Sequence, residues 1–188
     1  MATCGELLGA TCALYNRLNA GLLCSIGQWQ TPPDFRPQDK PEGHICYDVI
    51  SQGMDDLFEV HDLQSSTYAT SDPNVQPYAL QTYVGKAVFF GGQAVGSLCV
   101  VFQKEFAPTE DDRKILRIIA AAISLEEERQ HAESALRESE KRYRNIIETL
   151  PDAIMITREG RHVYVNLAAV RLFVAANAEQ LQIGRAHV

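Results

Sequence analysis

The spacing of apolar and polar residues changes once along the chain. Between residues 10 and 103, apolar residues alternate with polar ones or form short runs bounded by turn residues, which is typical of strands. Between Asp111 and Leu150 they recur at heptad spacing, which is typical of a long helix. The sequence therefore predicts a sheet-rich first part followed by an extended helix.

The first part contains two predicted hairpins. Residues 10–18 and 22–29 flank a three-residue loop that contains Gly21. The register expected from this loop pairs Leu18 with Leu22, Asn16 with Cys24, and Leu14 with Ile26. Residues 81–90 and 93–103 flank Gly91-Gly92, which suits the primed turns of two-residue hairpins.

The segment between the hairpins is long and mostly irregular. Residues 30–42 include four prolines, residues 44–50 form a candidate short helix, and residues 57–60 form a candidate strand. Residues 64–75 are polar and rich in turn residues. This segment is therefore expected to cover one face of the sheet.

A helix continuous from about residue 109 to residue 150 is predicted next. Thr109 is its expected N-cap, and acidic residues fill the first turn. Such a helix is about 60 Å long. Ile115, Leu116, Ile119 and Ile123 are expected to pack on the sheet. Further along, we expect a dimer seam in which the helix pairs with a second copy of itself, formed by Leu125, Leu136, Tyr143, Ile146 and Leu150.

Composition excludes several classes of protein. The chain has 188 residues, a net charge of -7 and 46% apolar residues, and no cluster of Lys and Arg suggests a nucleic-acid partner. No apolar stretch reaches the length of a membrane span, and no secretory signal opens the chain. Five cysteines, an odd number, favour reduced and buried thiols in a cytoplasmic protein.

The first part resembles the GAF domain family in the order of its elements and in two motifs. Residues 83–88 and 95–100 look like the last hairpin of GAF domains, and residues 41–48 are similar to a form found in sensor kinases. The resemblance implies an α+β fold: an antiparallel sheet with flanking helices over residues 1–128. Residues 129–142 are then the coiled-coil linker.

The last part resembles the beginning of a PAS domain. Residues 139–154 look like the segment that leads into that fold, and residues 160–169 resemble its first hairpin and the following helix, with Asn166 as the expected N-cap. The resemblance implies a partial PAS α/β fold over residues 143–184, truncated before its later strands. Residues 183–188 match one reading frame of a common sequencing adapter, so an artefact is expected there.

A ligand pocket is expected between the sheet and residues 30–75, because this long connection is the element able to cover the second face. The candidate lining residues are Trp29, His44, Cys46, Tyr47, Tyr78 and Tyr83. No metal ligands and no catalytic residues are predicted, and the cofactor is left unknown. GAF relatives that attach bilins commonly carry His directly after the Cys, whereas Tyr47 follows Cys46 here.

Two classes of function follow from these resemblances. The first is a cytoplasmic signal-sensing and relay module from a sensor histidine kinase of two-component phosphorelay signalling. It would act as a parallel homodimer with a downstream kinase domain and a small-molecule ligand, and the chain itself would not be an enzyme. The alternative is a cysteine-dependent enzyme, since free methionine-R-sulfoxide reductases share the GAF fold.

Overall fold

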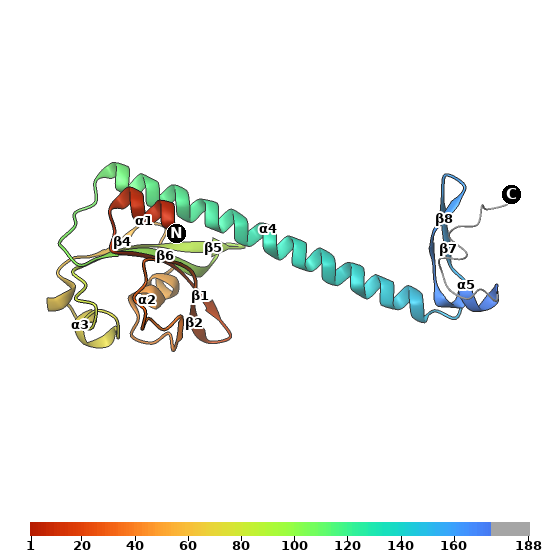
Figure 1. The fold of residues 1–188 in the computed structure, drawn as a ribbon, viewed down its shortest axis with the longest axis horizontal. Coiled ribbons are helices and arrows are strands. Elements are labelled where there is room, and N and C mark those ends of the chain that lie inside the picture. Colours follow the sequence, from red (N-terminus) through yellow and green to blue (C-terminus); the bar gives the residue numbers. More distant parts are fainter. Residues whose placement is uncertain (174–188) are drawn as a thin grey trace. The chain divides into compact units, whose positions relative to one another are not determined.

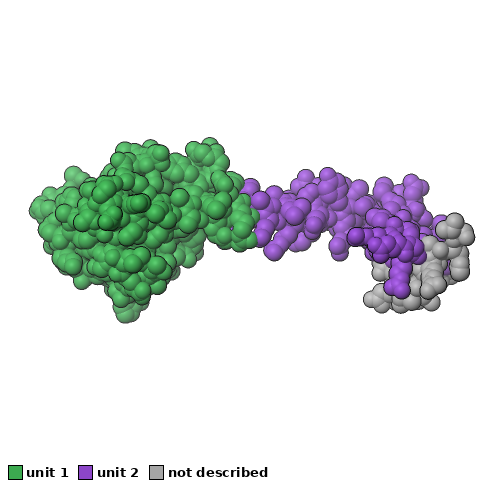
Figure 2. Space-filling model, turned by 90° about the horizontal axis from the view of Figure 1, so that it is seen from above, with its two compact units in different colours: residues 1–129 green, residues 130–188 purple. Residues whose placement is uncertain are grey.

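The structure is a computed structural model and describes residues 1–173. The chain divides into two compact units, residues 1–129 and the residues that follow (Figure 2). The predicted tail over residues 183–188 lies outside the described residues. Among the described helices, none is both long enough and apolar enough to span a bilayer.

The first unit is a six-stranded antiparallel sheet between helices (Figure 1). Its strands lie in the order β3-β2-β1-β6-β5-β4. The two predicted hairpins therefore form the centre of the sheet, as expected. The elements are α1 (Ala2–Leu8), β1 (Cys12–Asn19), β2 (Leu22–Trp29), β3 (Gln38–Asp39), α2 (Ile45–Gln52), β4 (Phe58–Val60), the short 3-10 helix η1 (Leu63–Ser65), α3 (Tyr68–Ser71), β5 (Thr82–Phe90), β6 (Gln93–Phe102) and α4 (Glu110–Thr149).

The first hairpin differs from its predicted register. Its turn has two residues, Ala20 and Gly21, both with positive φ, so Leu18 pairs with Leu23 rather than with Leu22. Such a turn matches the twist of the flanking strands better than the expected three-residue loop. Asn16 consequently pairs with Ser25.

A bulge then changes the side of the sheet to which residues 27–29 of β2 point. Asn16 pairs with Ser25 and Tyr15 pairs with Gly27, so Ile26 is an extra residue in β2. Side chains after the bulge point to the opposite face from the one that regular alternation would give. In the second hairpin, Phe90 pairs with Gln93 around Gly91-Gly92 as predicted, and a bulge at Val95 follows, between the pairs Phe89–Ala94 and Val88–Gly96.

The sheet has one core on each face. We call the side covered by α1 and α4 the helix face; its buried residues include Val84, Leu98, Val100, Phe102 and Leu116. The other side is the pocket face. It is covered by α2, η1 and the segments around them, and its buried residues include Cys12, Ile45, Val49, Tyr83 and Cys99.

Helix α4 begins with the predicted cap. The Asp112 backbone N–H donates to Thr109 Oγ1 at 3.2 Å, and the Thr109 N–H donates back to Asp112 Oδ2 at 2.8 Å. Leu116 is buried on the sheet, and the three predicted isoleucines are half-buried beside it. The residues of the predicted dimer seam are exposed in the single chain; Leu125 is 68% exposed and Leu136 61%. Their pairing stays a prediction.

The second unit contains the end of α4, a hairpin of β7 (Met155–Arg158) and β8 (Arg161–Val165), and α5 (Leu167–Leu172). Asn166 is fully buried and caps α5 as predicted, accepting from the Ala169 N–H at 3.0 Å. Its oxygen also accepts from the Ile154 N–H, and its amide donates to the carbonyls of Ile147 and Asp152. One side chain thus ties the hairpin and α5 to the end of α4.

Candidate functional site

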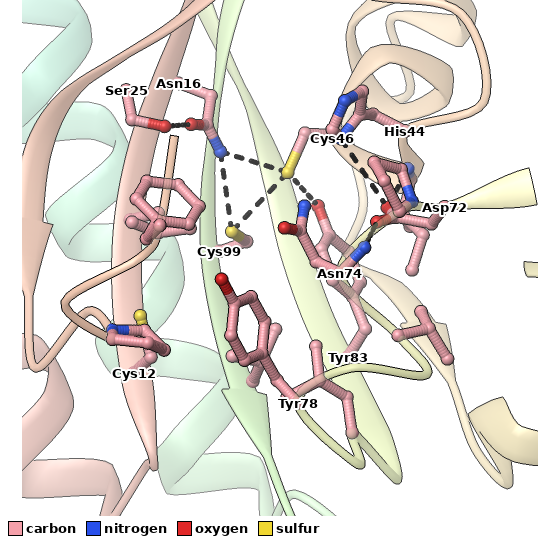
Figure 3. Close-up of a pocket in the computed structure, with 18 of the residues that line it drawn as sticks. Cys12, Asn16, Ser25, His44, Cys46, Asp72, Asn74, Tyr78, Tyr83 and Cys99 are labelled. Carbon is pink, nitrogen blue, oxygen red and sulfur yellow. Dashed lines mark hydrogen bonds and ion pairs between the residues drawn. The ribbon is translucent and has the colours of Figure 1, made fainter. Parts of the chain in front are cut away.

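The pocket face contains a cavity of about 430 Å³ (Figure 3). It lies between strands β1, β2, β5 and β6 on one side and residues 30–46 and 72–80 on the other, which is where the sequence placed a pocket. Its lining is mixed. Apolar residues include Leu14, Leu23, Phe35, Val75, Leu80 and Val101, and polar ones include Asn16, Ser25, Arg36, Asp39, His44 and Asp72.

A buried cluster of sulfur and polar groups lies at one end of the cavity. Cys46, in the first turn of α2, lies 3.6 Å from Cys99 of β6, measured between the two Sγ atoms. Asn16 of β1 donates its amide to Cys46 Sγ at 3.0 Å and approaches Cys99 Sγ at 3.8 Å. Tyr83 of β5 donates its hydroxyl to Cys46 Sγ at 3.4 Å and lies 3.2 Å from Ser97 Oγ.

Two neighbouring residues, Ser25 and Gly85, orient the hydrogen-bond donors of Asn16 and Tyr83 toward Cys46. Ser25 donates to Asn16 Oδ1, so the amide nitrogen of Asn16 is the end that faces the sulfur atoms. Gly85 leaves room for the Tyr83 ring to lie along the strand, because a Cβ at Gly85 would be 2.4 Å from the Tyr83 hydroxyl oxygen. Both strands therefore present a donor at the same point of the pocket.

The beginning of α2 is fastened to the loop that holds Asp72. The Asp72 carboxylate accepts from the backbone N–H groups of Ile45 at 3.0 Å and Asn74 at 2.9 Å. His44 lies beside it, with Nδ1 3.8 Å from Asp72 Oδ2. Gly43 makes this approach feasible, since its φ is +89° and a Cβ there would lie 2.5 Å from the Ser71 carbonyl oxygen. These contacts fix the position of Cys46.

The two thiols of the pair have opposite pKa shifts. The pKa of Cys46 is lowered because its sulfur accepts hydrogen bonds from Cys99, Tyr83 and Asn16, which together outweigh the effect of burial. The pKa of Cys99 is raised because it donates to Cys46 and is buried. Burial likewise raises the pKa of Tyr83. Cys46 is therefore the thiol of the pair that loses its proton first.

Four of the six predicted pocket residues line the cavity: His44, Cys46, Tyr78 and Tyr83. Trp29 does not. It lies past the bulge in β2, which turns it to the helix face, and its ring covers Gly5 of α1 so closely that a Cβ there would be 2.0 Å away. Tyr47 is half-buried outside the lining, because successive helical residues point about 100° apart.

The sequence reasoning missed Asn16, Asp72 and Ser97 as site residues and treated Cys99 as an ordinary buried strand residue. No local pattern marks them. The pairing of β1 with β6 sets Asn16 opposite Ser97 and Leu14 opposite Cys99, and the loop after α3 brings Asp72 to the beginning of α2. Within residues 1–173, no group of three His, Cys, Asp or Glu side chains is arranged to hold a metal ion.

The same strand that reaches the cavity also contacts helix α4. Tyr15 and Arg17, on either side of Asn16, point to the helix face, where Glu127 of α4 is buried. The Tyr15 hydroxyl donates to Glu127 Oε1 at 2.6 Å, and Arg17 forms an ion pair with Glu127 Oε2 at 2.9 Å. Three consecutive residues of β1 therefore link the pocket with the long helix.

The comparisons with known proteins assign the class of fold. A model of the GAF domain matches residues 1–126, and the chain therefore belongs to the GAF domain family. A model of the PAS domain matches residues 141–184. The chain thus has a GAF domain followed by a long helix and a PAS segment, as the sequence predicted. None of the proteins with a curated function is similar enough to count as a relative.

Solved structures share the fold of the first unit. The blue-light-absorbing PixJ GAF domain of Thermosynechococcus elongatus has a TM-score of 0.60 at 14% identity, covering 73% of this chain and 86% of its own. A domain assigned to a two-component sensor histidine kinase of Sinorhizobium meliloti has 0.58 at 11%, covering 72% and 91%. The type II free methionine-R-sulfoxide reductase of Thermoplasma acidophilum has 0.53 at 19%, covering 65% and 84%.

Proposed function

We propose that the chain is the sensory and relay module of a cytoplasmic signalling protein. In this proposal a small molecule occupies the cavity on the pocket face, and the state of the pocket is passed through β1 to α4. The observation that carries the proposal is the arrangement of Tyr15, Asn16 and Arg17, which alternate between the pocket and Glu127 of α4. Five buried, unbridged cysteines fit a reducing compartment.

The output of this module would be a change in how two copies of α4 pair. The proposed partner is a second copy of the chain, aligned in parallel along the dimer seam. Arg129 and Ser139 occupy seam positions of the heptad pattern and weaken its apolar contact, which keeps two packings close in energy. A histidine kinase domain further along the full-length protein is the proposed receiver, so this chain would itself not be an enzyme.

The dimer is tested by analytical ultracentrifugation of the full chain. Wild type is expected to dimerise, and Leu136→Asp is expected to abolish dimerisation, because it buries a carboxylate in the seam. Ser134→Asp is the matched control: it adds the same charge two residues away, on the outer side of the heptad, and should leave the dimer intact. A monomeric wild type at high concentration would contradict the proposal.

A second candidate function is favoured by the Cys46–Cys99 pair. Two thiols 3.6 Å apart in a pocket are the groups that a GAF-fold methionine-R-sulfoxide reductase would need. The assay is to incubate the chain with free methionine sulfoxide and a thiol donor and to measure methionine. Turnover that disappears in Cys46→Ser would favour the enzyme; the sensory proposal predicts none above the buffer rate.

A further inference from the structure

The Cys46–Cys99 pair has the geometry of a thiol pair that can close and open. The two sulfur atoms are 3.6 Å apart and a disulfide bond is about 2.05 Å long, so closure needs a relative movement of about 1.5 Å. The two residues lie on different elements, since Cys46 begins α2 and Cys99 lies in β6. A bond between them would fasten α2 directly to the centre of the sheet.

The surroundings distinguish the roles of the two thiols. Asn16 and Tyr83 both donate to Cys46 Sγ, which stabilises its thiolate, the form that reacts. The Cys99 sulfur has weaker support, because Asn16 approaches it only at 3.8 Å and burial together with its contact to Cys46 raises its pKa. Cys46 and Cys99 both line the cavity, as does Cys12, whereas Cys4, on the helix face, does not. A small oxidant entering the cavity can therefore reach Cys46 with its partner thiol beside it.

We propose that Cys46 and Cys99 form a reversible redox pair that a hydroperoxide oxidises to a disulfide inside the pocket. This inference rests on the proposed sensory function only in placing the pair in the sensory pocket, and it adds a means of regulating that pocket. It differs from the reductase alternative, because the reacting oxidant is a peroxide and the product of interest is the protein disulfide itself.

The chemistry balances in two steps. The Cys46 thiolate attacks one oxygen of the hydroperoxide, the O–O bond breaks, and the leaving alkoxide takes a proton to become an alcohol while Cys46 becomes a sulfenic acid. The Cys99 thiol then attacks the sulfenic sulfur, the S–S bond forms, and hydroxide leaves with the thiol proton as water. Two electrons pass from the thiols to the peroxide, and a small dithiol can return them.

Closure would rearrange the hydrogen bonds at this end of the cavity. The Cys46 sulfur that accepts from Asn16 and Tyr83 would become part of a neutral disulfide, which is a weaker acceptor than a thiolate. Asn16 lies between Tyr15 and Arg17, the two residues that hold Glu127 of α4. Oxidation of the pair would therefore change the surroundings of Asn16, and the neighbours of Asn16 in β1 contact α4.

The test uses the full chain and mass spectrometry under non-reducing conditions. Reduced protein is treated with cumene hydroperoxide, and the remaining thiols are then blocked. The expected result is a loss of two hydrogen atoms, a peptide pair joined through Cys46 and Cys99, and reversal by dithiothreitol. Because wild type alone answers the question, the test does not depend on a variant that folds. No linked pair, or earlier oxidation of Cys4, Cys12 or Cys24, would overturn the proposal.

Three variants assign the order of events. Cys99→Ser should stop at a Cys46 sulfenic acid that dimedone captures, and Cys46→Ser should leave Cys99 unmodified. Asn16→Ala should slow oxidation roughly tenfold, since it removes one hydrogen bond to the thiolate. Equal rates in wild type and Asn16→Ala would contradict the role given to Asn16. These readouts involve neither ligand binding nor dimerisation, so their failure is distinct from failure of the sensory proposal.

Discussion

The two faces of the six-stranded sheet are built from the same strands but have different interiors. On the helix face, Leu98, Val100 and Phe102 pack against Leu116 and Ala120 of α4 in a continuous apolar core. On the pocket face, the alternate residues surround a cavity and include the buried polar residues Asn16 and Ser97. The helix face therefore stabilises the fold, while the pocket face carries the groups that can respond to a small molecule.

The largest effect is expected from shortening a side chain in the apolar core. Leu116→Ala should lower the free energy of unfolding by roughly 2–5 kcal/mol, because it opens a cavity in a closed interior. Leu80→Ala on the pocket face should cost less, since Leu80 already borders an open cavity. Urea denaturation followed by the fluorescence of Trp29, the one tryptophan in the chain, measures both. Equal losses would remove the distinction between the faces.

The next effect concerns the buried acid on the helix face. Glu127→Ala should cost roughly 1–3 kcal/mol, because Tyr15 loses its acceptor and Arg17 its ion partner. Glu127→Gln should cost less, since its amide oxygen still accepts from Tyr15. The exposed neighbour Glu128 is the control, and Glu128→Ala should change stability by less than about 0.5 kcal/mol. Similar losses of stability for Glu127→Ala and Glu128→Ala would contradict the role given to Glu127 in holding α4 on β1.

Alkaline pH should weaken both faces through one cysteine on each. Burial raises the pKa of Cys4, on the helix face, and of Cys12, on the pocket face, from 9.0 to about 11. Because the folded protein holds these protons more tightly than the unfolded chain, stability is complete below pH 9 and falls as pH rises through 11. Ionisation of each thiol should cost up to about 1.4 kcal/mol of stability at pH 10.

Denaturation curves at several pH values test this linkage. Cys4→Ala and Cys12→Ala should each flatten the decline between pH 9 and pH 11, whatever their effect on stability at pH 7. The raised pKa values of Tyr15 and Tyr83 should sustain the decline above pH 10. A decline that is unchanged in both variants would show that neither thiol is the cause.

The smallest effect concerns thiol reactivity. Cys46 lines the cavity and has a lowered pKa, whereas Cys4 is buried under α4 with a raised one. Limited alkylation at pH 7 with iodoacetamide should therefore label Cys46 before Cys4, as peptide mapping would show. Labelling of Cys4 before Cys46 would contradict the view that the pocket face is more accessible to reagents than the helix face.

Much of the fold follows from local sequence signals. Gly91-Gly92 predicts the central hairpin, Thr109 with Asp112 predicts the start of α4, and Asn166 predicts the start of α5; all three are confirmed. These features depend on residues within a few positions of one another. The register of the first hairpin differs from the prediction because its turn has two residues, Ala20 and Gly21, rather than three. The extra residue Ile26 then changes the face to which the end of β2 points, and the apolar pattern does not reveal it.

The site was less predictable than the fold. The location of the cavity follows from the length of the 30–75 connection, but the Cys46–Cys99 contact joins residues 53 positions apart. Asn16 and Asp72 enter the site through strand pairing and loop closure, which single-sequence periodicity does not encode. Trp29 shows the converse: its aromatic ring suits a pocket, yet one bulge places it on the other face.

In the proposed relay, a change in the pocket reaches α4 through β1. Hydrogen exchange of the full chain measures this most directly, by comparing two pocket variants. Asn16→Ala perturbs the pocket on β1, and Leu80→Ala perturbs it away from β1. Faster exchange in residues 120–130 of α4 is expected for Asn16→Ala and not for Leu80→Ala. Unchanged exchange there in Asn16→Ala, or the same change in both variants, would contradict it.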